Sequence, residues 1–514
     1  MTHPLFDGYE KLNLYFGDIH NHCGLSYGHG SLEEALANAR LQLDFTSVTI
    51  HAVWPDLPAD DPQLAYLVNY HKKGFAHARR NWPAYLAAME AANDEGRFVT
   101  FPSFEWHSNQ YGDHCVYYNP SPSASPASVA ELPIIDARNL PELRQRVRET
   151  GVPSLVIPHH IGYRQGYRGI NWETFDNELS PLVEVFSFHG LSESSRGPYP
   201  YLHSMGPRHG PSTAQHAWAD GKVFGIIGST DHHNAFPGSY GYGRMGVWAT
   251  SLTRDAIWEA IAKRRTYALT GDRIALGFRV NESLMGDIGP GARERWIEAE
   301  VIGGDVIDYV EVLHNNQVIY RSYPFSEIVR QGRFKVHLEA GWGERKTEMS
   351  WKVTVSVHGG KLLDVEPRFQ GYGPTDEPGD TQYAYTGIQR QGENQVSFTT
   401  RTRANPSLHT SATEGLALEI QGDEATTFTA VANGETYQVA LGELLHGARA
   451  FYTGGFVSPA LCFHQAAPEA AYRQRLTFSH VSDGRDRDWY YMRVRQANNQ
   501  WAWSSPIWIA GESA

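Results

Sequence analysis

Short apolar runs recur along the first half of the chain, and segments with helical spacing separate them. Residues 12–16, 45–50 and 98–104 are rich in β-branched, aromatic and other apolar residues, which is typical of buried strands. Ser31 and Glu34 form a capping box, and the apolar spacing after it predicts a helix packed on a sheet. Strands that alternate with helices up to about residue 270 predict a parallel α/β sheet or barrel.

The longest helical segment covers residues 64–93. We expect an interruption near Pro83, because proline removes a backbone donor from a helix interior. Shorter helices are predicted over residues 141–150, closed by Gly151, and over residues 254–265.

The pattern changes after Gly271. Residues 350–357 alternate strictly between polar and apolar side chains, and residues 309–313 lead into a turn at Asn315-Asn316. Such short alternating strands with Gly and Asn turns predict a β-sandwich. A chain of 514 residues exceeds the size at which one core stops growing. We therefore predict two domains, an α/β domain at 1–272 and a smaller β-sandwich-like domain at 273–514.

The apolar runs of the first half stop at side chains that can bind a metal ion. His20 and His22 follow the first run and point to the same side, because side chains in a strand alternate with period two. Chemistry in α/β folds lies at the carboxyl ends of the strands, whereas unrelated histidines would scatter over helices and loops. This placement predicts a metal site. The residues at the boundaries of the runs are His20, His22, His51, Glu105, His114, His159, His189, Asp231 and His233.

Net charge, apolar content and cysteine count limit the kinds of partner and compartment that we expect for the protein. A net charge of −13 argues against a nucleic-acid partner, which needs a basic footprint. No apolar run is long enough to span a membrane, and no basic segment with an apolar core opens the chain. Cys23, Cys115 and Cys462 do not form a disulfide framework. We expect a cytoplasmic protein that acts on a small molecule, and composition leaves its oligomeric state open.

The same residues resemble the successive motifs of the PHP (polymerase and histidinol phosphatase) superfamily. The motifs are Gly17-Asp18-Ile19-His20-Asn21-His22, Thr49-Ile50-His51, Glu105, His114, Pro158-His159 and Ser229-Thr230-Asp231-His232-His233. Residues 265–273 and 503–508 look like those of a branch long labelled as a domain of unknown function, which also carries a C-terminal β region. The resemblance implies a distorted seven-stranded, TIM-like β/α barrel.

The resemblance also implies two or three divalent transition-metal ions. His20, His22, Glu105 and Asp231 would hold one ion, and His29, His51 and His233 a second. A third would lie between His114, His159 and a bridging Glu105. Imidazole and carboxylate ligands suit Mn, Zn or Fe. Paired ions in such sites share a water whose pKa falls to roughly 7, which implies hydrolysis by a metal-bridging hydroxide with Glu105 and Asp231 as catalytic residues.

Further side chains are candidates for the same pocket. His160 and His232 are each either a proton donor or a side chain that points away from the metals, and His189 and Glu184 could line the pocket. Arg164 and Arg168 follow the His159 strand. They could bind an anionic substrate group, because arginine pairs bidentately with phosphate or carboxylate, or they could be ordinary surface arginines. We include His160 and His189 among the catalytic candidates.

The predicted function is a metal-dependent hydrolase, most simply a phosphoesterase. One alternative keeps the metals and changes the bond, to an ester, lactone, amide, glycosidic or other C–O linkage. A second alternative is a metal-stabilised binding protein without turnover.

Overall fold

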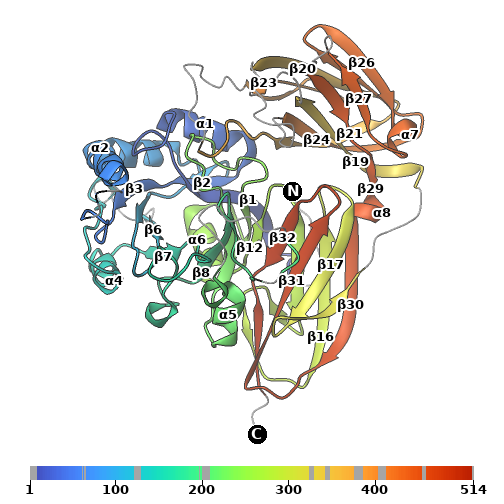
Figure 1. The fold of residues 1–514 in the computed structure, drawn as a ribbon. Coiled ribbons are helices and arrows are strands. Elements are labelled where there is room, and N and C mark those ends of the chain that lie inside the picture. Colours follow the sequence, from blue (N-terminus) through green and yellow to red (C-terminus); the bar gives the residue numbers. More distant parts are fainter. Residues whose placement is uncertain are drawn as a thin grey trace.

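The computed structural model describes residues 8–60, 62, 65–120, 129–195, 197–199, 209–322, 329–341, 348–375, 386–402, 413–453 and 459–511. The fold is mixed α/β, with helices gathered around the first half of the chain and β-sheets forming the second half (Figure 1). The helices are α1 (Leu32–Gln42), α2 (Ala65–Ala92), α4 (Leu140–Glu149), α5 (Ala214–Ala219), α6 (Arg254–Ala262), α7 (Leu441–Leu444) and α8 (Glu469–Tyr472), with 3₁₀ turns at Trp172–Thr174 and Gly210–Ser212.

Helix α2 corrects one expectation. It runs as a single helix from Ala65 to Ala92 with Pro83 inside it, so the interruption expected there is absent. Its apolar face is buried against the sheet through residues such as Trp82, Tyr85 and Met89. The packing of that face offsets the hydrogen bond that proline removes.

The strands of the first half divide among three sheets. β3 (Ile50–Val53), β5 (Ser103–Trp106), β6 (His114–Tyr118) and β7 (Ser154–Pro158) form one, and β8 (Leu182–Ser187), β9 (Gly190–Leu191) and β10 (Gly225–Gly228) form another. β1 (Asn13–Asn21), β2 (Phe45–Val48), β4 (Val99–Thr100), β11 (Arg244–Ala249) and β12 (Thr266–Leu269) belong to the third. β7 lies beside β8 and β10 beside β12. In the described residues no continuous hydrogen-bonded barrel links the three sheets.

The third sheet extends into the end of the chain. β12 pairs with β32 (Trp501–Ser504), which leads to β31 (Arg487–Gln496), β33 (Ile507–Ala510) and β15 (Ile288–Gly289). β17 (Ile307–His314) pairs with β31, and β18 (Gln317–Arg321) with β17. One sheet thus contains strands from both sides of residue 272, and the expected domain boundary there stays a prediction.

A four-stranded antiparallel sheet packs on this extended sheet. It contains β14 (Ser283–Leu284), β13 (Ala275–Val280), β16 (Glu294–Ile302) and β30 (Arg473–Val481). Their common core includes Phe278, Ile297, Val310 and Tyr490.

Two further antiparallel sheets enclose a separate core, at the upper right of Figure 1. One contains β21 (Lys361–Arg368), β24 (Thr413–Asp423), β19 (Gln331–Gly341), β28 (Ala460–Phe463), β27 (Arg449–Tyr452) and β29 (Ala467–Pro468). The other contains β22 (Thr386–Arg390), β23 (Gln395–Thr402), β20 (Met349–His358), β25 (Thr427–Ala432) and β26 (Glu435–Ala440). We call this pair the C-terminal sandwich. In it the expected alternation is visible, because every second residue of β20 from Trp351 to Val357 is buried.

Among the described residues, none of the helices is both long and apolar enough to cross a membrane.

Candidate metal centre

Strands β1, β3 and β5 place three imidazoles and a carboxylate side by side. His20 and His22 are two residues apart at the end of β1 and are fully buried. His51 in β3 lies opposite Glu105 in β5, so their side chains share one face of that sheet. Asp231 follows β10 and joins the group through its backbone, because its N–H donates to the His20 carbonyl at 2.7 Å.

Asp18 fixes the end of β1 to the segment that carries Asp231. Its buried carboxylate accepts hydrogen bonds from the Thr230 hydroxyl, the Gly238 N–H and the His20 N–H. Asp231 itself has φ = 52°, and His160 has φ = 30°. Residues with a Cβ seldom occupy this left-handed region, and strain of this kind gathers at functional sites.

The His20 Nε2, the His22 Nε2 and the Asp231 carboxylate face one another. The His22 Nδ1–H donates to the Thr49 carbonyl at 2.7 Å, and the His20 Nδ1 lies 2.9 Å from the Glu184 carboxylate. In neutral rings so held, both Nε2 atoms carry lone pairs. These Nε2 atoms lie 3.2 Å apart, and the Asp231 Oδ1 lies 3.0 Å from the His22 Nε2 and 3.4 Å from the His20 Nε2. Three acceptors this close repel one another unless a cation or proton lies between them.

Glu105 stands at the centre of the imidazoles. Its Oε2 is 3.4 Å from the His51 Nε2, 3.5 Å from the His22 Nε2 and 3.8 Å from the His20 Nε2. Its Oε1 lies 3.0 Å from the His159 Nε2 and 3.1 Å from the His107 Nδ1. The buried Oε2 has no hydrogen-bond partner. A buried carboxylate oxygen without a donor is costly, and a divalent ion would satisfy it.

The charge states suit metal binding. Burial alone would raise the pKa of the Glu105 carboxyl, but the facing imidazoles of His107, His51 and His159 hold it well below its usual value. Burial lowers the pKa of His159 to about 4 and of His233 to about 3, which leaves their rings neutral. Burial also lowers the pKa of His20, but the facing Cys115, Asp231 and Glu184 outweigh it and raise that pKa above its usual value. Without metal, His20 is thus the ring that keeps a proton.

A second group of potential ligands consists of His22, His51 and His233, whose ring nitrogens lie within 4.8 Å of one another. The His51 Nδ1 contacts the Ser26 hydroxyl at 2.8 Å, and the His233 Nδ1–H donates to the Asp231 carbonyl at 2.8 Å. Such partners fix the orientation of metal-binding imidazoles. His29 meets this group through its main chain, since its N–H donates to the His233 carbonyl at 2.7 Å.

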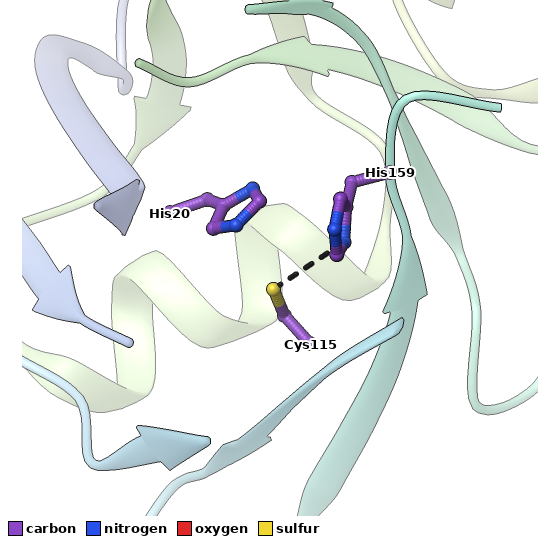
Figure 2. Close-up of side chains that lie close together, drawn as sticks. All are labelled: His20, Cys115 and His159. Carbon is purple, nitrogen blue, oxygen red and sulfur yellow. Dashed lines mark hydrogen bonds between the residues drawn. The ribbon is translucent and has the colours of Figure 1, made fainter. Parts of the chain in front are cut away.

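Strand β6 turns Cys115, rather than His114, toward His159. Cys115 lies opposite Glu105 in the ladder, whereas His114 lies opposite Trp106. Alternation then sends His114 to the other face of the sheet, where its Nδ1–H donates to the Gly112 carbonyl. Figure 2 shows the Cys115 thiol between the rings of His20 and His159, 3.6 Å from the His159 Nδ1. The third ion was expected between His114, His159 and Glu105. In the structure His114 points away from the other two residues, and Cys115 takes its place beside His159.

Glu184, His189 and His160 surround the centre. Glu184 lies behind His20, and burial raises the pKa of its carboxyl to about 7. The His189 Nε2 lies 3.0 Å from the Asp231 Oδ2, and its Nδ1 contacts the Tyr163 hydroxyl at 2.6 Å. The His160 Nε2 lies 3.4 Å from the Asp113 carboxylate. His189 is partly open to solvent, with a 15% exposed side chain, whereas His160 is buried.

Arg168 reaches the edge of this group, because its Nη2 lies 3.3 Å from the His107 Nδ1. The Arg168 guanidinium binds the fully buried Asp113, with its Nε at 2.8 Å from the Asp113 Oδ2. Arg164 is exposed and stacks its guanidinium on the Tyr167 ring at 3.9 Å. His232 uses both ring nitrogens for backbone contacts, since its Nδ1 accepts from the Asn234 N–H and its Nε2–H donates to the Tyr372 carbonyl.

Sequence reasoning missed three members of the group, His107, Asp113 and Cys115. The Asp113 Oδ2 lies 3.0 Å from the His107 Nδ1, which also contacts Glu105. A signal for His107 was available, because Glu105 and His107 have the same spacing as His20 and His22. Asp113 gave no such signal, since it lies in a turn between two strands.

Comparison with known proteins gives one family match and several distant relatives. A family described as "Protein of unknown function (DUF3604)" matches residues 239–287. This match confirms, over those residues, the expected resemblance to a branch labelled as a domain of unknown function.

The curated relatives are proteins named only as uncharacterized. One from Chlamydia trachomatis serovar D is 25% identical over 251 residues, which cover 45% of this chain and 39% of the relative. One from Chlamydia pneumoniae is 22% identical over 267 residues, covering 48% and 41% of the two chains. The chain thus spans about two fifths of the length of the relatives it matches.

Among solved structures, the chain is similar to a two-domain protein from Bacteroides vulgatus that is described as containing a predicted PHP-like metal-dependent phosphoesterase. That likeness covers 84% of this chain and 96% of the other at 13% sequence identity, with a TM-score of 0.33.

Proposed function

We propose that the protein is a metal-dependent hydrolase whose reaction takes place at the His20, His22, Glu105 and Asp231 group. The observation that carries the proposal is the set of facing acceptors. Two imidazole lone pairs and a carboxylate oxygen lie within 3.4 Å of one another beside an unpartnered Glu105 oxygen. Buried acceptors are normally paired with donors, and divalent cations are the group that satisfies this set. Two or three ions of Mn, Zn or Fe suit its imidazole and carboxylate ligands.

The substrate bond we propose is a phosphoester, which the resemblance of the motif series to the PHP superfamily supports. Ions held by these residues would activate water and polarise the scissile group. The Thr49 carbonyl and the Glu184 carboxylate bind the Nδ1 atoms of His22 and His20. The Nε2 atoms of both rings are therefore the nitrogens that would bind an ion. His189 is the side chain best placed to move a proton, since it contacts Asp231 and the Tyr163 hydroxyl and reaches solvent.

A non-phosphate bond is the second candidate, and the arginines favour it. A phosphate-binding pocket usually offers a free cation to its anion. Here Arg168 is paired with the buried Asp113, and the Arg164 guanidinium lies on Tyr167. An ester, lactone, amide or glycosidic bond would place less charge in the pocket.

Elemental analysis followed by a substrate screen tests the proposal. We expect transition metal in the purified protein and its loss in Asp231→Ala, with the exposed Asp220→Ala as the matched control. A panel of phosphomonoesters, phosphodiesters and carboxyl esters then separates the two candidate bonds. Undiminished metal in Asp231→Ala would refute the assigned ligand set, and metal without any turnover on a broad panel would favour a binding protein.

A further inference from the structure

A small cavity lies away from the metal centre, where β1 meets the C-terminal sandwich and β30. Its volume is about 40 Å³. Roughly 10–15 Å³ measured in this way holds one water molecule, so the cavity has room for a group of a few heavy atoms. Its charged lining residues are Arg273, Arg333, Lys335, Arg473, Glu419 and Glu469.

The four cations exceed the two carboxylates, and two of the cations lack an acidic partner. The Arg333 Nη1 lies 3.8 Å from Glu419, and Arg473 contacts Glu469 and Glu300. The side chains of Arg273 and Lys335 form no ion pair with any residue in the described part of the chain. The Lys335 Nζ donates to the Gly303 carbonyl at 2.7 Å.

Arg273 is held in place by neutral groups and by its backbone. Its Nη2 donates to the Gln42 carbonyl at 2.7 Å, and its backbone N–H donates to the Glu366 carboxylate at 2.9 Å. Aromatic rings lie under both unpaired cations, with Phe16 5.7 Å from the Arg273 guanidinium and Tyr472 4.9 Å from the Lys335 ammonium. This packing positions the two charges at the cavity wall.

Two buried polar atoms of the lining have no hydrogen-bond partner. They are the Nε of Arg273 and the hydroxyl of Tyr472, and the Tyr472 side chain is only 1% exposed. The first is a donor and the second can donate. Leaving such groups unsatisfied costs roughly 1–3 kcal/mol each, so native structures usually provide a partner for them. An acceptor with several oxygens fits both atoms and the two unpaired cations.

We propose that this cavity binds a small oxyanion, either phosphate or a short carboxylate, at the joint between the extended sheet and the C-terminal sandwich. The anion would accept hydrogen bonds from Arg273, Lys335 and Tyr472. These residues belong to three different parts of the chain, so binding would tie helix α8 and the sandwich strand β19 to the segment between β12 and β13 that holds Arg273. The cavity is too small for a nucleotide.

Calorimetric titration of the full-length protein tests the site, with inorganic phosphate in one arm and acetate in the other. Because a metal centre also binds anions, each titration is repeated on Asp231→Ala. We expect binding to persist in Asp231→Ala and to weaken about 10- to 100-fold in Lys335→Met, as the loss of one charge-assisted hydrogen bond implies. The matched control is Lys361→Met, which removes an exposed lysine from the same sandwich sheet.

Tyr472→Phe keeps the ring and removes only the hydroxyl, so it tests the site even if Lys335→Met fails to fold. Weaker binding of phosphate alone would identify phosphate as the ligand class, and weaker binding of acetate alone would identify a carboxylate. Unchanged affinity in both Lys335→Met and Tyr472→Phe would overturn the proposal. Binding that disappears in Asp231→Ala, or no binding of either anion at millimolar concentration, would overturn it as well.

Discussion

The metal centre and the core of the C-terminal sandwich are both buried, but polar side chains make up the first and apolar side chains the second. In the sandwich, Val353, Phe398 and Leu418 are at most 2% exposed and belong to one core of apolar side chains. In the centre, His20, His22 and Glu105 are equally buried, yet the two Nε2 atoms and the Glu105 Oε2 face one another at 3.2–3.8 Å. The apolar packing of the sandwich needs no added group, whereas the cation that we propose for the centre would balance its lone pairs and charges.

The largest effect is expected from Glu105→Gln. The amide keeps the size of the side chain but removes the charge that faces five histidines, so activity should fall about 10³-fold or more. Turnover of the substrate found in the screen measures the effect. Glu282→Gln, at an exposed position, should leave activity unchanged. A folded Glu105→Gln protein that retains most of its activity would contradict a central role for this carboxylate.

Phe398→Ala should destabilise the C-terminal sandwich without changing the metal content of the protein. Removing a buried phenyl ring leaves a cavity and costs about 3–5 kcal/mol of unfolding free energy, which denaturant unfolding measures. Val431→Ala, a partly exposed position in the same sandwich, should cost far less. Metal content equal to that of the wild type would show that the two regions are independent, and a matching loss of metal would show that they are coupled.

Chelation is the converse test. A ligand present at 100 times its dissociation constant stabilises the folded state by about 2.7 kcal/mol, so EDTA should lower the thermal midpoint by the corresponding amount. Phe398→Ala and the wild type should show the same shift. If EDTA leaves the midpoint unchanged in protein shown to contain metal beforehand, the centre does not depend on a cation for stability.

Glu184→Gln should have a smaller effect. Its carboxylate orients His20 from the side opposite the metal ligands, and loss of such a partner typically costs 10- to 100-fold in metal affinity. Competition with a fluorescent zinc chelator measures that affinity. We expect His20→Ala to cost more than Glu184→Gln, and the reverse order would mean that Glu184 is itself a ligand.

Arg164→Ala is expected to give the smallest change. If the exposed guanidinium contacts an anionic group of the substrate, its loss should raise KM about tenfold, since a charge-assisted hydrogen bond contributes roughly 1.5 kcal/mol or more. Metal content should not change, and Arg164→Lys should restore only part of the affinity. An unaltered KM would leave Arg164 as a surface residue packed on Tyr167.

The sequence was most informative where a strand ends in a ligand. Period-two spacing and the position of chemistry at strand ends are local rules, and they predicted ligands where the apolar runs stop. That His20, His22, Glu105 and Asp231 share one ion was implied by the resemblance to the PHP motifs. The orientation of His114 could not be deduced in this way. Every residue of β6 is buried, so no polar–apolar alternation marks which of its two faces points toward the centre.

The sequence also did not predict which distant strands pair with each other. The patterns of residues 350–357 and 309–313 predicted strands of a β-sandwich, but nothing in them distinguished the sandwich strand β20 from β17, which joins the sheet of β1. Both have buried, β-branched or aromatic side chains on the face that packs. The choice of partner depends on packing across the whole molecule, and local sequence does not carry that information.

The pairing of Tyr267 in β12 with Ser504 in β32 has a consequence for synthesis of the protein. At about 5–20 residues per second, the ribosome needs roughly 10–50 s to proceed from the first strand to the second. During that time the apolar edge of β12 has no neighbour, and an open edge of this kind invites pairing with other chains. The nascent chain is therefore most vulnerable to aggregation between these two points, and chaperones that shield extended segments should improve its yield.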